Sequence, residues 1–150
     1  MRIAVATDHA GLPIKNAVIE AIKESGHEVL DLGTDSNESS DYPDFAEKAG
    51  RAVINGEAER AVVMCGSGVG VNITLNKMKG IYASVCHDAY SAHQGVEHDN
   101  MNVLCMGGAV VGKNHAKEIV KNFLSATMMD DERFLRRINK FKAIENEFMK

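Results

Sequence analysis

The chain has 150 residues, of which 45% are hydrophobic and 25% charged, an ordinary composition for a globular domain. Its formal net charge is -4 and no basic stretch offsets the acidic balance, which argues against a nucleic-acid partner. No apolar run approaches the length that spans a bilayer, and the first residues lack a signal-peptide layout. We therefore expect one domain over residues 1–150, no membrane partner and a cytoplasmic location.

Short β-rich runs alternate with helical periodicity along the whole chain. In chain order, strands are expected at residues 3–7, 28–32, 61–65, 81–85 and 103–106. Helices are expected over residues 14–22, from near Pro43, directly after Gly70, over 90–97, over 116–124 and over about 130–147. Five strands that alternate with helices imply an α/β fold. The predicted architecture is a Rossmann-like three-layer α/β/α sandwich with a five-stranded parallel sheet.

Cysteine usage points to free thiols. Cys65, Cys86 and Cys105 are odd in number and widely spaced, which indicates neither a disulfide framework nor a zinc site. The six histidines are scattered singly, so we expect no metal site. Cys86 and Cys105 are interpreted as buried packing residues.

Polar or reactive side chains lie beside several predicted strand ends. Asp8 and His9 follow the first strand, Cys65 closes the third, and His98 precedes the fifth. Ligands of open parallel sheets bind beyond the carboxyl ends of the strands, so we expect the site at that edge. His9 and His98 are both predicted to lie there. A lone histidine is more often structural, but at this edge it could shuttle a proton near neutral pH.

Cys65 on its own would be interpreted as a small buried hydrophobic residue. The sequence after it changes the balance, because Gly66, Gly68 and Gly70 let the backbone turn sharply and expose N–H groups beside a helix N-terminus. Such surroundings favour a thiolate, which could remove a proton next to a carbonyl while the amides stabilise the enediolate. From the residues alone, the two interpretations stay balanced.

Dinucleotide binding is a rival interpretation of this turn. The spacing is Gly-x-Gly-x-Gly rather than Gly-x-Gly-x-x-Gly, and it follows the third strand rather than the first. Asp88 lies at a suggestive distance, but no acidic residue closes a second strand of the same unit. No Gly-Lys-Ser/Thr follows, which excludes a P-loop. We therefore expect no cofactor.

The last predicted helix carries an apolar stripe from Phe134 to Phe148 and, beside it, Arg133 and Arg137 at i,i+4 spacing. Two arginines so placed could clamp a phosphate, since the guanidinium fork matches phosphate oxygens. The spacing alone favours an ordinary solvated face whose arginines pair with Glu or Asp.

Four motifs together resemble ribose-5-phosphate isomerase type B, a family that also includes galactose-6-phosphate and allose-6-phosphate isomerases. They are Asp8-His9-Ala10-Gly11, Asp41-Tyr42-Pro43, Cys65-Gly66-Ser67-Gly68-Val69-Gly70 with Asn76-Lys77, and Glu97-His98-Asp99-Asn100-Met101-Asn102-Val103. The resemblance covers essentially the whole chain in consistent order. It implies a metal-free aldose–ketose isomerase of the pentose phosphate pathway that acts on a sugar phosphate, with ribose 5-phosphate and ribulose 5-phosphate as the expected pair.

The resemblance also implies residue roles and a homodimer, in some members a tetramer, with active sites shared between subunits. Cys65 would carry the proton between C1 and C2, Ser67 and the turn amides would hold the enediolate oxygen, and His98 of the partner subunit would assist ring opening. The residues implied in substrate binding are Asp8, His9, Tyr42, Gly66, Gly68, Val69, Gly70, Asp99 and Asn100, with His9, Arg133 and Arg137 at the phosphate.

Three positions depart from the family pattern. Ser67 replaces a frequent threonine and keeps the hydroxyl, whereas Phe134 removes a polar contact where Arg-His is common. Ala109 stands where an arginine phosphate ligand is usual, and that loss should weaken phosphate binding by ~1.5–3 kcal/mol. Arg136 or Lys113 could compensate. Isomerisation of a six-carbon or unphosphorylated sugar, or non-catalytic binding of a nucleotide or sugar phosphate, remain alternatives.

Overall fold

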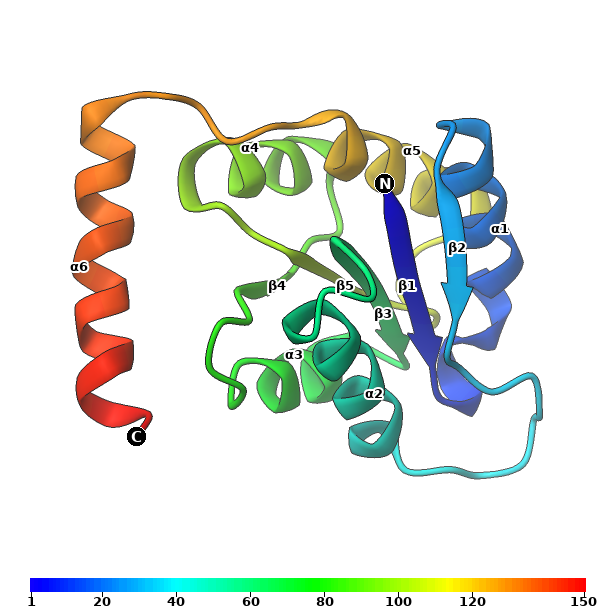
Figure 1. Ribbon diagram of the computed structural model, residues 1–150. Coiled ribbons are helices and arrows are strands. Elements are labelled where there is room, and N and C mark those ends of the chain that lie inside the picture. The colour runs from blue at the N-terminus through cyan, green and yellow to red at the C-terminus, as the bar shows by residue number, and fades with distance from the viewer.

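The computed structural model describes residues 1–150 (Figure 1). Its strands are β1 (Arg2–Thr7), β2 (Glu28–Asp31), β3 (Arg60–Cys65), β4 (Ala83–Val85) and β5 (Val103–Gly107). Its helices are η1 (His9–Gly11), α1 (Leu12–Glu24), α2 (Tyr42–Ile54), α3 (Val69–Leu75), α4 (Ala89–Asp99), α5 (Lys113–Ser125) and α6 (Glu132–Phe148). All strand pairs are parallel, in the order β2-β1-β3-β5-β4, so the predicted α/β fold with its five-stranded parallel sheet is confirmed. None of the helices combines the length and apolar character that a membrane crossing requires.

The fourth strand is shorter than predicted, because it begins at Ala83 rather than Ile81. Side-chain amides replace ladder partners at its start: the Tyr82 N–H donates to Asn102 Oδ1 at 2.8 Å, and the Ala83 N–H donates to Asn76 Oδ1 at 3.0 Å. The run does form a strand, as its β-propensity predicts. The N–H groups of its first residues, however, form hydrogen bonds to side chains rather than to a neighbouring strand.

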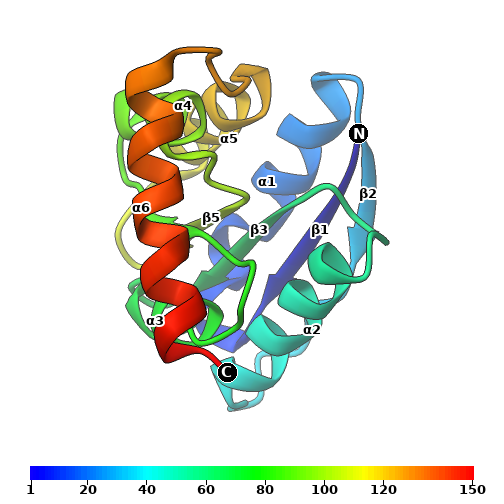
Figure 2. The same cartoon turned by 60° about the vertical axis from the view of Figure 1, so that its left-hand side comes forward.

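Helices cover both faces of the sheet, and alternate strand residues belong to two separate cores (Figure 2). In β3, Val62 and Met64 pack in the core formed with α1, α4 and α5. Val63 and Cys65 pack in the other core, with α2 and α3. This alternation places the Cys65 side chain on the α2–α3 face, at the last position of the central strand.

The strand order creates a switch point between β1 and β3. From β1 the chain moves outward to β2 on one side, whereas β3, β5 and β4 lie on the other side. Crevices form at such points beyond the carboxyl ends of the strands, because the connections there lead away in opposite directions. Asp8 follows β1 and Cys65 ends β3, so both lie at this switch point.

Helix α6 stands beside the rest of the molecule and leans on α4 (Figures 1 and 2). Phe134 and Ile138 are buried, but Ile144 is 59% exposed and Phe148 77% exposed. The second half is tied down by Glu145, whose carboxylate accepts hydrogen bonds from Gly80 N–H at 2.6 Å and from the Tyr82 hydroxyl at 2.7 Å. The apolar stripe predicted on this helix is therefore buried only in its first half.

Candidate active site

The turn after β3 places one backbone amide against the Cys65 sulfur. Cys65 is 5% exposed, and its Sγ accepts a hydrogen bond from the Gly68 N–H at 3.2 Å. The Ser67 hydroxyl accepts from the Val69 N–H at 3.2 Å. The N–H groups of Gly66 and Ser67 donate to no other group of the protein. Gly68 adopts a φ of 82°, which favours glycine, so the residue at this position suits the conformation that directs the Gly68 amide at the sulfur.

The other two thiols have different surroundings. Cys86 and Cys105 are fully buried in the two cores, and burial raises the pKa of both thiols above the ordinary value. A raised pKa favours the neutral, unreactive thiol. This supports their interpretation as packing residues and distinguishes Cys65 as the cysteine that has an amide donor.

The segment after β5 lies directly against the Cys65 turn. The Gly108 N–H donates to the Cys65 carbonyl at 2.9 Å, and the Ala109 N–H donates to the Gly66 carbonyl at 3.0 Å. A Cβ on Gly107 would lie 2.7 Å from the Gly66 oxygen, so this close approach requires glycine. Gly107 and Gly108 were not predicted as site residues, although paired glycines directly after a buried strand are a signal of close backbone approach.

Tyr42 reaches the same turn from α2. A Cβ on Gly70 would lie 2.6 Å from Tyr42 Cε1, so the tyrosine ring lies against the bare backbone of Gly70. The ring is partly exposed at the first residue of α2. Tyr42 and Gly70, predicted together as substrate-binding residues, are thus neighbours in space.

Asp8 and His9 form the β1 side of the carboxyl edge. Asp8 is buried, and its Oδ1 accepts hydrogen bonds from Ala10 N–H at 2.9 Å and Gly11 N–H at 3.2 Å, which caps η1. The His9 Nδ1 accepts from the Ser40 N–H at 3.1 Å, and the His9 N–H donates to Ser40 Oγ at 3.2 Å. With Nδ1 acting as an acceptor, the proton of the neutral ring is on Nε2, which can donate to an anion.

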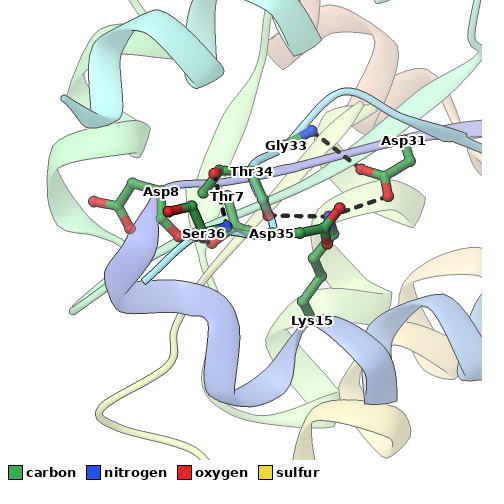
Figure 3. A network of polar contacts seen from close by, with 8 residues as sticks. All are labelled: Thr7, Asp8, Lys15, Asp31, Gly33, Thr34, Asp35 and Ser36. Carbon is green, nitrogen blue, oxygen red and sulfur yellow. Dashed lines mark hydrogen bonds and ion pairs between the residues drawn. The ribbon is translucent and has the colours of Figure 1, made fainter. Parts of the chain in front are cut away.

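A buried lysine holds the start of the loop that follows β2 (Figure 3). Ser40 lies further along the same loop. Lys15 is 2% exposed, and its Nζ contacts the Thr34 carbonyl at 3.1 Å, Asp35 Oδ1 at 2.8 Å and Asp31 Oδ2 at 3.1 Å. Burial alone lowers the pKa of Lys15, but the hydrogen bonds and charges of the two aspartates outweigh it, so the pKa is raised. Sequence reasoning missed Lys15, whose signal is a lysine directly beside the apolar stripe of α1.

His98 does not lie at the carboxyl edge, so that prediction is wrong. It is in the last turn of α4, and a helix that connects two parallel strands runs back toward their amino ends. In Figure 1, α4 ends beside α6, away from the end of β3. Asp99 and Asn100 follow His98, with Asn100 in the left-handed region at φ 54°. Within one chain the structure therefore separates His98, Asp99 and Asn100 from Cys65.

The two candidate phosphate ligands lie near His98 rather than near His9. The Arg133 and Arg137 guanidinium carbons are 5.3 Å and 5.9 Å from the Phe134 ring centre, and the His98 ring stacks on Phe134 at 3.9 Å. Arg133 also makes a forked contact with Asp131, at 3.2 Å and 3.0 Å, whereas Arg137 makes no ion pair.

Neither suggested substitute for the missing arginine joins this cluster. Arg136 forms an ion pair with Glu132, one turn earlier on α6, at 2.7 Å. Lys113 lines a groove between α1 and α5 with Asn16 and Lys117. Ala109 itself is exposed beside the Cys65 turn, so an arginine there would have room to extend.

A parallel sheet that carries a cysteine, a glycine turn and a histidine along its carboxyl edge has the arrangement of a small-molecule enzyme, and comparison with known proteins identifies the class as sugar isomerases. A family model described as Ribose/Galactose Isomerase matches residues 3–141. The chain therefore belongs to the ribose/galactose isomerase family.

Individual relatives agree with this class over nearly the whole chain. The chain is 40% identical to ribose-5-phosphate isomerase B of Escherichia coli, with 96% of each chain covered. It is 35% identical to D-erythrulose-4-phosphate isomerase of Pectobacterium atrosepticum, with 84% of each chain covered. Among solved structures, ribose-5-phosphate isomerase B of Clostridium thermocellum matches with a TM-score of 0.93 and 40% identity, covering 99% of each chain.

Proposed function

We propose that the protein interconverts ribose 5-phosphate and ribulose 5-phosphate, with Cys65 as the base. The observation that carries the proposal is the Gly68 amide 3.2 Å from Cys65 Sγ, at the end of the central strand and beside two free amides. An amide donor stabilises the thiolate form, and a sulfur anion near the switch point of the sheet can reach a bound sugar.

The reaction needs one proton moved between adjacent carbons. The Cys65 thiolate takes the proton from C2 of the open-chain aldose, and the electron pair forms the enediolate with its negative charge on O1. In this proposal the Ser67 hydroxyl and the N–H groups of Gly66 and Ser67 hold that oxygen; these two N–H groups donate to no other group of the protein, which supports the assignment. The Cys65 thiol then returns the proton to C1, while the C2 hydroxyl proton passes to O1 and leaves a C2 carbonyl.

The proposal includes a homodimer in which His98 of the partner subunit completes each site. His98 and Cys65 belong to opposite edges of the sheet in one chain, so a single copy does not bring them together. Helix α6 stands apart with Ile144 and Phe148 exposed, which suits coverage by a second copy. The phosphate would lie between His9 of one copy and Arg137 of the other. A cytoplasmic reaction remains a prediction.

Several sugars fit the proposal, because the family resemblance implies an arginine phosphate ligand where this chain has Ala109. One relative is named as an isomerase of the four-carbon sugar phosphate D-erythrulose 4-phosphate. A shorter, a six-carbon or an unphosphorylated sugar would therefore also fit the same chemistry. Comparing kcat/KM for ribose 5-phosphate, erythrulose 4-phosphate, allose 6-phosphate and ribose ranks these substrates.

Exchange of deuterium from solvent tests the base. Wild-type protein is incubated with ribulose 5-phosphate in deuterated water, and deuterium at C1 is followed by proton NMR. Cys65→Ser should abolish exchange and turnover while substrate binding, measured by calorimetry, persists. Cys86→Ser is the matched control, since Cys86 is also a buried free cysteine and directly follows β4, two strands away in the same sheet. Wild-type protein that binds the sugar with neither exchange nor turnover would identify a non-catalytic binding module.

A further inference from the structure

An aromatic residue lies between the proposed ring-opening group and the proposed phosphate ligands. Phe134 is 8% exposed and fills the contact between α4 and α6. The His98 ring stacks on it with 3.9 Å between centroids and 17° between planes. Arg133 and Arg137 flank the same ring at 5.3 Å and 5.9 Å. All three functional side chains of α4 and α6 therefore share one buried neighbour.

This arrangement fixes the imidazole in two ways. The second side-chain torsion of histidine is broad, so the ring plane needs an external constraint, and the parallel Phe134 ring supplies it. The Gln94 side-chain amide lies 2.7 Å from His98 Nδ1 and occupies that nitrogen. Nε2 is then the nitrogen that remains to exchange a proton with a substrate.

The sugar itself demands a fixed spacing between these groups. In the furanose form of ribose 5-phosphate, the ring oxygen O4 and the phosphate-bearing C5 are attached to the same carbon, C4. Ring opening breaks the C1–O4 bond, forms the C1 carbonyl and moves one proton from the C1 hydroxyl to O4. The group that carries this proton and the cation that binds the phosphate must therefore be held at a fixed distance from each other.

We propose that Phe134 is a positioning residue that holds His98 for ring opening and sets its spacing to Arg137. This inference rests on the proposed isomerase function.

Two reactions distinguish a positioning role of Phe134 from a role in packing alone. Conversion of ribose 5-phosphate requires ring opening. Exchange of deuterium into C1 of ribulose 5-phosphate does not, because its O5 carries the phosphate and the ketose cannot close a furanose ring. At saturating substrate, Phe134→Leu should slow conversion at least about tenfold, part of the 10²–10⁴-fold supplied by general acid–base catalysis, and leave exchange unchanged. Phe134→Tyr keeps the aromatic face and should restore conversion.

Ile138→Val is the matched packing control, because Ile138 is buried one turn further along α6 and is not stacked on His98. Its ratio of conversion to exchange should equal that of the wild type. If Phe134→Leu lowers both reactions equally, or leaves conversion intact, Phe134 is a packing residue and the inference is wrong. If wild-type protein neither converts nor exchanges, the proposed function fails instead.

Discussion

Replacing Gly68 by alanine tests the geometry of the Cys65 turn most directly. Gly68 has a φ of 82°, and an added Cβ would lie 2.9 Å from the carbonyl carbon of Met106. The left-handed conformation alone costs an alanine about 1–2 kcal/mol. Crowding against a strand backbone that cannot rotate away adds about 1–3 kcal/mol. The Gly68 N–H must shift with its residue, which weakens its hydrogen bond to Cys65 Sγ.

The matched variant is Gly56→Ala, because Gly56 has a φ of 77° and no atom within 4 Å of the added Cβ. It carries the conformational cost without the crowding. Urea unfolding should therefore show Gly68→Ala as less stable than Gly56→Ala by about 1–3 kcal/mol. A hydrogen bond to a charged group is worth about 1.5–3 kcal/mol, so kcat of Gly68→Ala should fall roughly 10- to 100-fold while Gly56→Ala keeps wild-type kcat.

Equal stability of the two variants would refute the crowding of Gly68 against Met106. A folded Gly68→Ala variant with wild-type kcat would refute the role of the amide at the sulfur. The free energy of unfolding and kcat are measured independently, so the crowding at Gly68 and the role of its amide are tested separately.

Three further substitutions test the phosphate ligands and the buried lysine. Ala109→Arg should lower KM for ribose 5-phosphate about tenfold or more but not KM for ribose, whereas Val110→Arg, at the exposed neighbour, should change neither. Arg137→Met should raise KM for ribose 5-phosphate about tenfold, while Arg136→Met should not; equal effects would contradict the clamp. Lys15→Met should cost about 1–3 kcal/mol in urea unfolding at pH 8. Because the folded pKa of Lys15 is raised, the wild-type advantage is complete below pH 10.5 and should shrink as the pH rises through the raised value.

The sheet and the Cys65 turn were predictable because their signals are local. Buried β-rich runs alternate with helical stripes, and glycines at 66, 68 and 70 directly follow the third strand. The position of His98 was not predictable in the same way, since it depends on the direction in which α4 crosses the sheet. His98 precedes β5 rather than follows a strand, so it lies near the amino ends of the strands.

Contacts between segments that are distant in the sequence could not be predicted either. Lys15 meets Asp31 and Asp35 only because β2 lies beside β1, and His9 meets Ser40 through the loop that Lys15 holds. The spacing of apolar residues predicts the stripe on α6, and its first half is buried. Its exposed second half shows that periodicity identifies a face that will be covered, but not by what.

In the proposed homodimer, the placement of Cys65 and His98 at opposite ends of the strands predicts complementation between two variants. In a mixed pair of one Cys65→Ser chain and one His98→Ala chain, one site inherits both defects and the other inherits neither. Two inactive proteins, refolded together, should therefore regain turnover that neither recovers alone. Dilution below the dissociation constant of the pair should remove that turnover again.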